Sequence, residues 1–407
     1  MKTPFLYLLP FLFLPNLGLA RPTPFGVLEI SDYLIIPYLA LVLLGRPTRR
    51  PVIAKRLKPL LWGFVVWAAL STVTINLRFE YSDSYYLCLG LLKLGKLALY
   101  GLAGYLTCLS LKSRESVDRF HWALLIGGLV LAVSLVLTSP LSASGSAGGD
   151  QISGFKATNA VSVMMAILLC YLGGAYGVGA GTSLWRRAVQ VSIVVMVIGF
   201  AMSKGRGGWI AALVGFGFLT WKQGVRRRTA IALVLLLGSM YVAYRTIPVF
   251  SEQVDRTLDP DPVAAQEYGI GAIGVDDGGR VATWRVEAKR FVDHPIMGTG
   301  FFHRGGQTRL WETGSHNFWL QMFLELGLVG GLLSTAIPIS MWRQSSMIVW
   351  RKALRIPTQG ALIAGVVGGL GGEYFYGGMV VMTLFLVYSP IGRQVLLPAE
   401  IPVDPLT

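Results

Sequence analysis

Two cations lie among glycines in the segment from Ser203 to Gly208. Lys204 and Arg206 are separated only by Gly205, and two further glycines follow before the next apolar run. Glycine lets backbone N–H groups approach an anion closely, and the start of the following helix adds the positive end of its dipole. The segment is therefore a candidate anion-binding turn. The alternative is that both side chains reach the lipid headgroups from a helix end.

A second candidate group lies in the longest stretch without an apolar run. Arg280 and Arg285 flank Trp284 there. A guanidinium group binds phosphate oxygens in bidentate fashion and stays charged at any working pH. We therefore consider these residues for binding a phosphorylated substrate. The alternative is ordinary pairing with nearby carboxylates, such as Asp276 for Arg280 and Glu312 for Arg285.

The third candidate is the sequence Ser315-His316-Asn317, which opens an apolar run. Histidine is the side chain best suited to accept a proton near neutral pH, and the dipole at a helix start favours its neutral form. His316 is therefore a candidate base for a hydroxyl substrate, with Asn317 beside it. In the alternative interpretation, Ser315 or Asn317 caps the helix and His316 is an interface residue.

Metal binding is weakly indicated. His294, His303 and His316 share one stretch of chain, but their spacing fits no zinc pattern. The Asp259-Pro260-Asp261 sequence is typical of a turn, although some sugar transferases use such a pair for a divalent ion. We expect no metal and no cofactor.

The elements that must position these residues are membrane helices. Of the 407 residues, 53% are hydrophobic and only 14% are charged, with a mean hydropathy of +0.57. Such a chain lacks the polar residues needed to cover a water-soluble globule, and its apolar runs are long and unbroken. The sequence predicts an all-α polytopic membrane protein with about 12 transmembrane helices. Their centres are near Leu12, Pro37, Val66, Leu97, Gly128, Leu168, Val195, Val214, Leu236, Val329, Val366 and Leu384.

Two parts of this assignment leave alternatives open. The first run, from Phe5 to Ala20, contains two prolines and could also be a cleaved signal; we expect a retained helix. The last two runs are separated only by the segment from Glu373 to Tyr376, so this hairpin could be partly re-entrant.

The net charge of +15 would suggest nucleic acid in a soluble protein, but most Lys and Arg residues cluster in short connections between apolar runs. Basic short loops are retained in the cytoplasm, so we expect no nucleic acid and a cytoplasmic N-terminus. The sequence then divides into residues 1–247 with nine helices, a long periplasmic loop over 248–315, and residues 316–407 with three helices and a tail.

Four motifs follow one another along the chain. They are Gly154-Phe-Lys-Ala-Thr-Asn159; Ser203-Lys-Gly-Arg206-Gly; Arg280-Val-Ala-Thr-Trp284 followed by Phe291-Val-Asp-His-Pro-Ile-Met-Gly-Thr-Gly300; and His316-Asn317 with Leu320-Gln321 and Glu325-Leu-Gly327. Together they resemble the O-antigen ligase superfamily, a group of bacterial inner-membrane glycan transferases that includes lipid-linked polysaccharide polymerases. In that order they are similar to the family's "G-x-F-x-x-x-N" segment, its "S-x-S-R-G" turn, its long periplasmic loop and its "HN…LQ…ELG" pattern.

The resemblance implies a fold of the GT-C type and a metal-independent glycosyltransferase in the bacterial inner membrane. It implies that a glycan passes from undecaprenyl diphosphate to a hydroxyl acceptor on the periplasmic face. By matching motifs, Arg206 and Arg280 would hold the lipid diphosphate, and His316 would orient or deprotonate the acceptor. Lys204 departs from the family's uncharged residue and would add a third cation or only reach the headgroups.

The family resemblance leaves several activities open. A ligase would use lipid A core as the acceptor, and a polymerase would use a second lipid-linked repeat unit. A protein O-oligosaccharyltransferase and a transporter of lipid-linked glycan are the remaining alternatives. If His316 removes the acceptor proton during in-line attack, the configuration at the anomeric carbon should invert.

Overall fold

The computed structural model describes most of the helical part of the chain. The described residues are 3–14, 21–23, 26–28, 30–45, 52–78, 84–111, 113–138, 158–203, 205–224, 227–246, 251, 288, 291–301, 317–347, 352–371 and 379–394. Within these residues the protein is all-α apart from one short antiparallel hairpin, in which β1 (Arg21–Thr23) pairs with β2 (Gly26–Leu28). The all-α prediction is therefore confirmed for the described residues.

Eleven of the predicted apolar runs form α-helices in the described residues. In chain order these are α2 (Ile30–Leu44), α3 (Val52–Arg78), α4 (Ser84–Ser110), α5 (Arg114–Thr138), α6 (Thr158–Gly177), α7 (Ser183–Met202), α8 (Arg206–Gln223), α9 (Arg227–Thr246), α13 (Phe318–Ser346), α14 (Lys352–Leu370) and α15 (Met379–Gln394).

Six of these helices are long and apolar enough to cross a membrane: α3, α4, α5, α6, α7 and α13. Helices α2, α14 and α15 contain shorter apolar stretches. The protein is thus a multi-pass membrane protein, while the number of twelve spans remains a prediction. The segment from Glu373 to Tyr376, between the last two helices, lies outside the described residues. Whether this hairpin is partly re-entrant therefore stays open.

The first apolar run is shorter in helical form than its length in sequence suggests. It contains α1 (Phe5–Leu8) and a 3₁₀ helix, η1 (Leu9–Phe13), with Pro10 near the start of η1. At the rises of α and 3₁₀ helices these nine residues extend roughly 16 Å, whereas a bilayer core is about 30 Å thick. Phe5, Leu9 and Phe13 are nevertheless buried, and η1 packs against α5 and α2.

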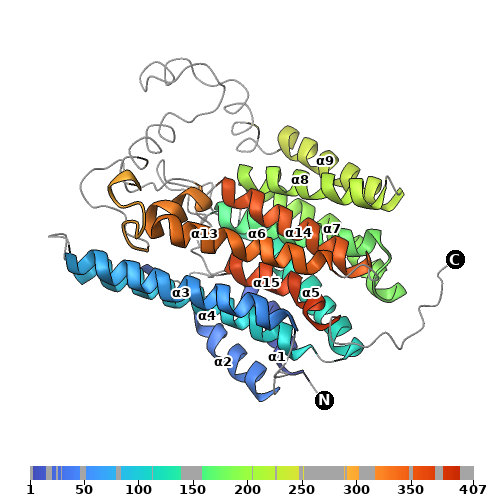
Figure 1. Ribbon diagram of the computed structural model, residues 1–407. Helices are drawn as coiled ribbons and strands as arrows, with labels where there is room; N and C mark the ends of the chain where they lie inside the picture. Colours follow the sequence, from blue (N-terminus) through green and yellow to red (C-terminus); the bar gives the residue numbers. More distant parts are fainter. Residues whose placement is uncertain are drawn as a thin grey trace, which may run out of the picture.

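Helix α6 lies at the centre of the bundle. Of its apolar window, Ala160–Gly177, 94% is buried, the highest fraction among the candidate spans. It packs against α7, α8, α14 and α15, and Figure 1 shows these helices gathered around it. Helices α3 and α4 lie along one side of this group, where α3 contacts α13 and α4 contacts α15.

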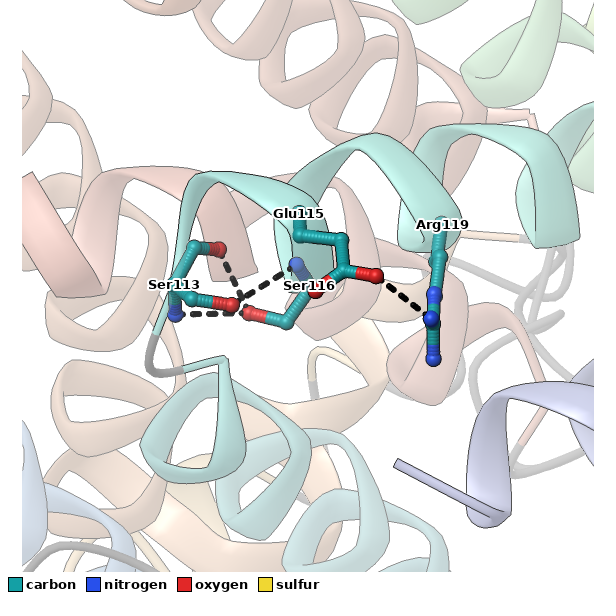
Figure 2. Close-up of polar contacts among 4 residues, drawn as sticks. All are labelled: Ser113, Glu115, Ser116 and Arg119. Carbon is teal, nitrogen blue, oxygen red and sulfur yellow. Dashed lines mark hydrogen bonds and ion pairs between the residues drawn. The ribbon is translucent and has the colours of Figure 1, made fainter. Parts of the chain in front are cut away.

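Helix α5 starts with a capping arrangement that specifies its first residue. The backbone N–H of Ser116 donates to Ser113 Oγ, and the backbone N–H of Ser113 donates to Ser116 Oγ. Figure 2 shows this exchange beside the ion pair of Glu115 with Arg119 one turn further on. Reciprocal bonds of this kind satisfy N–H groups that a helix start leaves without partners.

An ion pair joins α2 to α4. Lys96 Nζ lies 2.7 Å from Asp32 Oδ2, and Tyr100 Oη donates to Asp32 Oδ1 over 2.7 Å. Further along both helices, Tyr38 Oη lies 2.6 Å from Thr107 Oγ1. The two helices therefore run in the same direction. Charged side chains inside a membrane are expensive unless they are paired, and this pair keeps α2 in register with α4.

Several of the described basic residues lie at one end of the bundle. We call the end where α8 and α13 start the loop end, because residues 291–301 pack there against α3 and α13. The opposite end carries described basic residues at the ends of several helices, including Lys58, Arg119, Lys222, Arg343 and Arg355. The sequence predicts that this end faces the cytoplasm, and the side of the membrane that it faces stays a prediction.

Candidate functional site

Helix α13 is broken near the loop end. Gly327 has φ 65° and ψ −169°, so residues 318–326 and 328–346 form two helical segments. The ordinary helical bond from the Leu328 N–H to the Leu324 carbonyl is absent, because Leu328 instead donates to Pro295 O over 2.8 Å. Backbone groups freed inside a membrane protein require other partners. Here the partners come from the long loop.

The loop residues 294–301 satisfy both sides of this break. The N–H of Thr299 donates to Leu324 O over 3.1 Å, and the N–H of Gly300 donates to Glu325 O over 2.8 Å. We call this arrangement of residues 294–301 with residues 324–328 the clasp. It fixes residues 294–301, in the last third of the predicted loop 248–315, to the helix that follows the loop.

Two glycines make this close approach possible. Gly298 has φ 70°, and a Cβ there would overlap the Glu325 carbonyl. A Cβ on Gly327 would overlap the Ile296 carbonyl. Positive φ is easily adopted only by glycine. The "G-T-G" and "E-L-G" elements of the family pattern therefore have a structural reason in this protein.

Helix α3 closes the other side of the clasp. Ser71 Oγ donates to Met297 O over 2.5 Å, and Trp67 Nε1 donates to Leu326 O over 2.8 Å. The Phe301 N–H donates to Thr72 Oγ1 over 2.9 Å, and the Phe301 ring is fully buried. The loop is thus held between α3 and α13 by buried polar contacts.

A buried carboxylate lies on α13 beside the break. Glu325 is 1% exposed, and its Oε1 accepts a hydrogen bond of 2.7 Å from Gln321 Nε2. Gln321 and Glu325 follow Asn317 at intervals of four residues, so the three lie on one face of the first segment of α13. This face leads from the helix start to the clasp.

Of the predicted site residues, Asn317 is the one whose side chain is described. It is the N-cap of α13, and its Oδ1 accepts from the Leu320 N–H over 3.1 Å. The capping alternative is therefore confirmed for Asn317, and its role in binding substrate remains a prediction.

The backbone of the predicted anion-binding turn is described at Ser203 and from Gly205 to Gly208. Arg206 is the first residue of α8, with Gly205 as the N-cap. A Cβ on Gly371, just after α14, would lie 3.1 Å from Gly207 Cα. Trp319, near the start of α13, donates from Nε1 to Val366 O of α14 over 3.0 Å. The starts of α8 and α13 therefore lie against the same end of α14.

The remaining predicted residues lie outside the described part of the chain. They are Lys204, Arg280, Trp284, Arg285 and His316, and the side chain of Arg206 also lies outside it. Whether the guanidinium groups and the imidazole converge therefore stays a prediction. Among the described residues, no group of three metal-ligating side chains lies together.

An apolar groove of about 410 Å³ lies between α3, α4, α13, α14 and α15. Phe318 and Trp319 line it near the loop end, and Lys58 lines it near the opposite end. Trp62 and Leu102, which also line the groove, are 61% and 47% exposed, so the groove is accessible from outside the bundle. Its mainly apolar lining suits a hydrocarbon chain. Phe318 and Trp319 bring this lining next to Asn317, the N-cap of α13.

The fold and this geometry define a helical, multi-pass membrane protein with a broken helix, a docked loop and an apolar groove. Residues 191–334 match the family described as O-Antigen ligase, which confirms the resemblance predicted from the motifs. The matched segment includes the turn at Arg206, the long loop and the first part of α13. The Gly154 to Asn159 motif lies outside it. No curated protein matches the chain.

The family match supports a glycosyltransferase-type activity of the O-antigen ligase kind, in the synthesis of surface glycan polymers. Sequence reasoning missed Trp67, Ser71 and Thr72, which hold the loop from α3. No local signal marks them, because Ser and Thr inside an apolar helix usually bond to their own helix. Gly298 and Gly327 were visible as motif residues, but their contact was not.

Proposed function

We propose that this protein transfers a glycan from undecaprenyl diphosphate to a hydroxyl acceptor on the periplasmic face of the bacterial inner membrane, as an O-antigen ligase does. The observation that carries the proposal is the match of residues 191–334 to the O-antigen ligase family. The groove supports it, because a polyprenyl tail needs an apolar surface to bind, and Phe318 and Trp319 line the groove directly after Asn317.

In the proposed reaction, the acceptor oxygen attacks the anomeric carbon while the bond from that carbon to the diphosphate oxygen breaks. The electron pair leaves with the carrier diphosphate, whose growing charge Arg206 and Arg280 neutralise. The acceptor proton passes to His316, and in-line attack inverts the anomeric configuration. Lys204, Trp284, Arg285 and Asn317 are proposed to contact the substrates. The reaction as proposed needs no metal.

The decisive experiment uses the purified full-length protein with a lipid-linked glycan as donor. Lipid A core and a second lipid-linked repeat unit are offered separately as acceptors. We expect a single transfer to lipid A core. A ladder of products on the lipid-linked acceptor would instead identify a polymerase, and no transfer to either acceptor would contradict the proposal.

The groove gives a second prediction about donor binding. A Cβ on Gly101 of α4 would have one neighbouring side chain, Val381, at 3.9 Å, so Gly101→Leu should fill part of the groove. Each buried CH₂ group contributes about 0.8 kcal/mol, so displacing two of them should raise the KM for the lipid-linked donor about tenfold. The KM for the acceptor should not change.

Gly95→Leu is the matched control for this prediction. Gly95 lies on the same helix, outside the groove lining, and a Cβ there would meet nothing within 4 Å. Kinetics with both variants at varied donor and acceptor concentrations give the comparison. Equal KM values for the donor in Gly101→Leu and Gly95→Leu would show that the groove does not bind the donor.

A further inference from the structure

We propose that α3 is a positioning element of the catalytic loop, acting through Thr72, Ser71 and Trp67. This inference rests on the proposed function, since it concerns the loop that carries Arg280 and leads to His316. Helix α3 lies outside the matched residues 191–334 and carries no motif of the family. Its role follows from contacts that connect distant parts of the chain.

The Thr72 hydroxyl makes two hydrogen bonds, one within α3 and one to the loop. Its O–H group donates to Ala68 O of its own helix over 2.7 Å, and its oxygen accepts from the Phe301 N–H over 2.9 Å. Thr72 is 1% exposed and Phe301 is fully buried, so water does not replace this acceptor. A side-chain oxygen of another helix is thus an acceptor for this loop N–H.

The neighbouring contacts fix the loop at that point. A Cβ on Gly90 of α4 would lie 2.5 Å from Phe301 O, so the loop backbone passes directly over α4. The rings of Phe301 and Phe64 of α3 meet edge to face, with centroids 6.5 Å apart. Ser71 holds the Met297 carbonyl. Helix α3 therefore fixes the position of residues 297–301 along its axis and the course of their backbone.

The same helix also holds the end of the first segment of α13. Trp67 donates to Leu326 O at the break, and Ser71 Oγ lies 3.4 Å from Glu325 O. The first segment of α13, which begins directly after Asn317, ends at this point. In sequence, Arg280 precedes residues 294–301, and His316 lies between the two parts of the clasp, directly before Asn317. The chain segments that carry both residues therefore lead into contacts that α3 makes.

Positioning of this kind matters because transfer requires the reacting groups to be aligned closely, and small displacements reduce the rate strongly. Loss of the Thr72 oxygen removes a buried acceptor of the Phe301 N–H and weakens the docking of the loop. A cost of this kind corresponds to about a tenfold shift or more in the equilibrium between docked and undocked loop.

The test compares Thr72→Val with Thr72→Ser in the full-length protein. Valine keeps the shape of threonine and removes the acceptor, whereas serine keeps the acceptor. Thr383→Val is the matched control, because Thr383 is also fully buried but its hydroxyl donates to Met379 O of its own helix. Two quantities are measured for each variant: hydrogen exchange of the peptide that covers residues 294–301, and kcat and KM for glycan transfer.

We expect Thr72→Val to exchange about tenfold faster over residues 294–301 and to lose about tenfold in kcat, with KM for the donor unchanged. Thr72→Ser and Thr383→Val should resemble the wild type in both quantities. If Thr72→Val does not fold, Ser71→Ala should give a smaller change in the same direction.

Two outcomes would overturn the proposal. Unchanged exchange in Thr72→Val would show that α3 does not hold the loop, and faster exchange with unchanged kcat would show that holding the loop has no part in transfer. Absence of transfer by the wild type would defeat the proposed function and the positioning role with it. The exchange measurement would then still report separately whether α3 holds the loop.

Discussion

Replacing His316 by alanine is expected to slow glycan transfer by roughly 10²- to 10⁴-fold, the usual contribution of a general base. Arg280→Ala should cause a loss of at least about 10²-fold, because a fixed cation on the leaving diphosphate acts mainly in the transition state. The rate of transfer by purified protein, at saturating donor and acceptor, measures both effects. The kcat should fall more than KM rises.

Two controls make this prediction specific. Arg245 lies exposed at the end of α9, just before the long loop, so Arg245→Ala tests whether loss of any nearby arginine matters. His303→Ala removes another histidine of the same loop and should leave transfer unchanged. A large loss in His303→Ala would favour the metal interpretation instead.

The same variants separate an enzyme from a transporter. A transporter of lipid-linked glycan needs cations for the diphosphate but no proton acceptor. It should therefore tolerate His316→Ala while losing function in Arg280→Ala. Full activity in both variants would contradict the enzymatic proposal.

Substitution of the clasp glycines is expected to have the largest effect on folding stability. Gly327→Ala and Gly298→Ala would each place a Cβ against a backbone carbonyl, at residues with φ of 65° and 70°. Positive φ costs an alanine roughly 1–3 kcal/mol, and the ψ of −169° at Gly327 is open essentially to glycine alone. Each clasp hydrogen bond that is broken and left buried costs about 1–3 kcal/mol more.

The expected total is therefore on the order of 4 kcal/mol for either variant, which is a large part of the stability of a typical domain. Thermal unfolding of the purified protein in detergent gives the comparison. Gly217→Ala on α8 is the control, since a Cβ there would meet nothing within 4 Å. Gly327→Ala that unfolds at the temperature of Gly217→Ala would show that the clasp is absent in the protein.

The positions of the helices could be predicted from the sequence alone. Long apolar runs must form helices in a membrane, because every backbone N–H and C=O group there needs a partner within the same segment. This local requirement places α3 to α9 and α13 to α15 close to the predicted centres. It does not fix the first run, where Pro10 favours a short 3₁₀ helix.

The candidate site was predicted in part. The cap at Asn317 follows a local rule, since a side-chain oxygen before an apolar run accepts an N–H of the first turn. The groove has no such rule. Its walls come from five helices, and each helix shows the same apolar pattern whether it faces lipid, core or groove.

The sequence by itself determined the helical membrane fold, the family resemblance and the types of residue available for chemistry. Only the tertiary structure decided that α13 breaks at Gly327, that the loop replaces the lost helical bonds, and that Thr72 of α3 receives the Phe301 N–H. The physical reason is that these hydrogen bonds join residues far apart in the chain, whereas periodicity and capping report only on neighbours within a few turns.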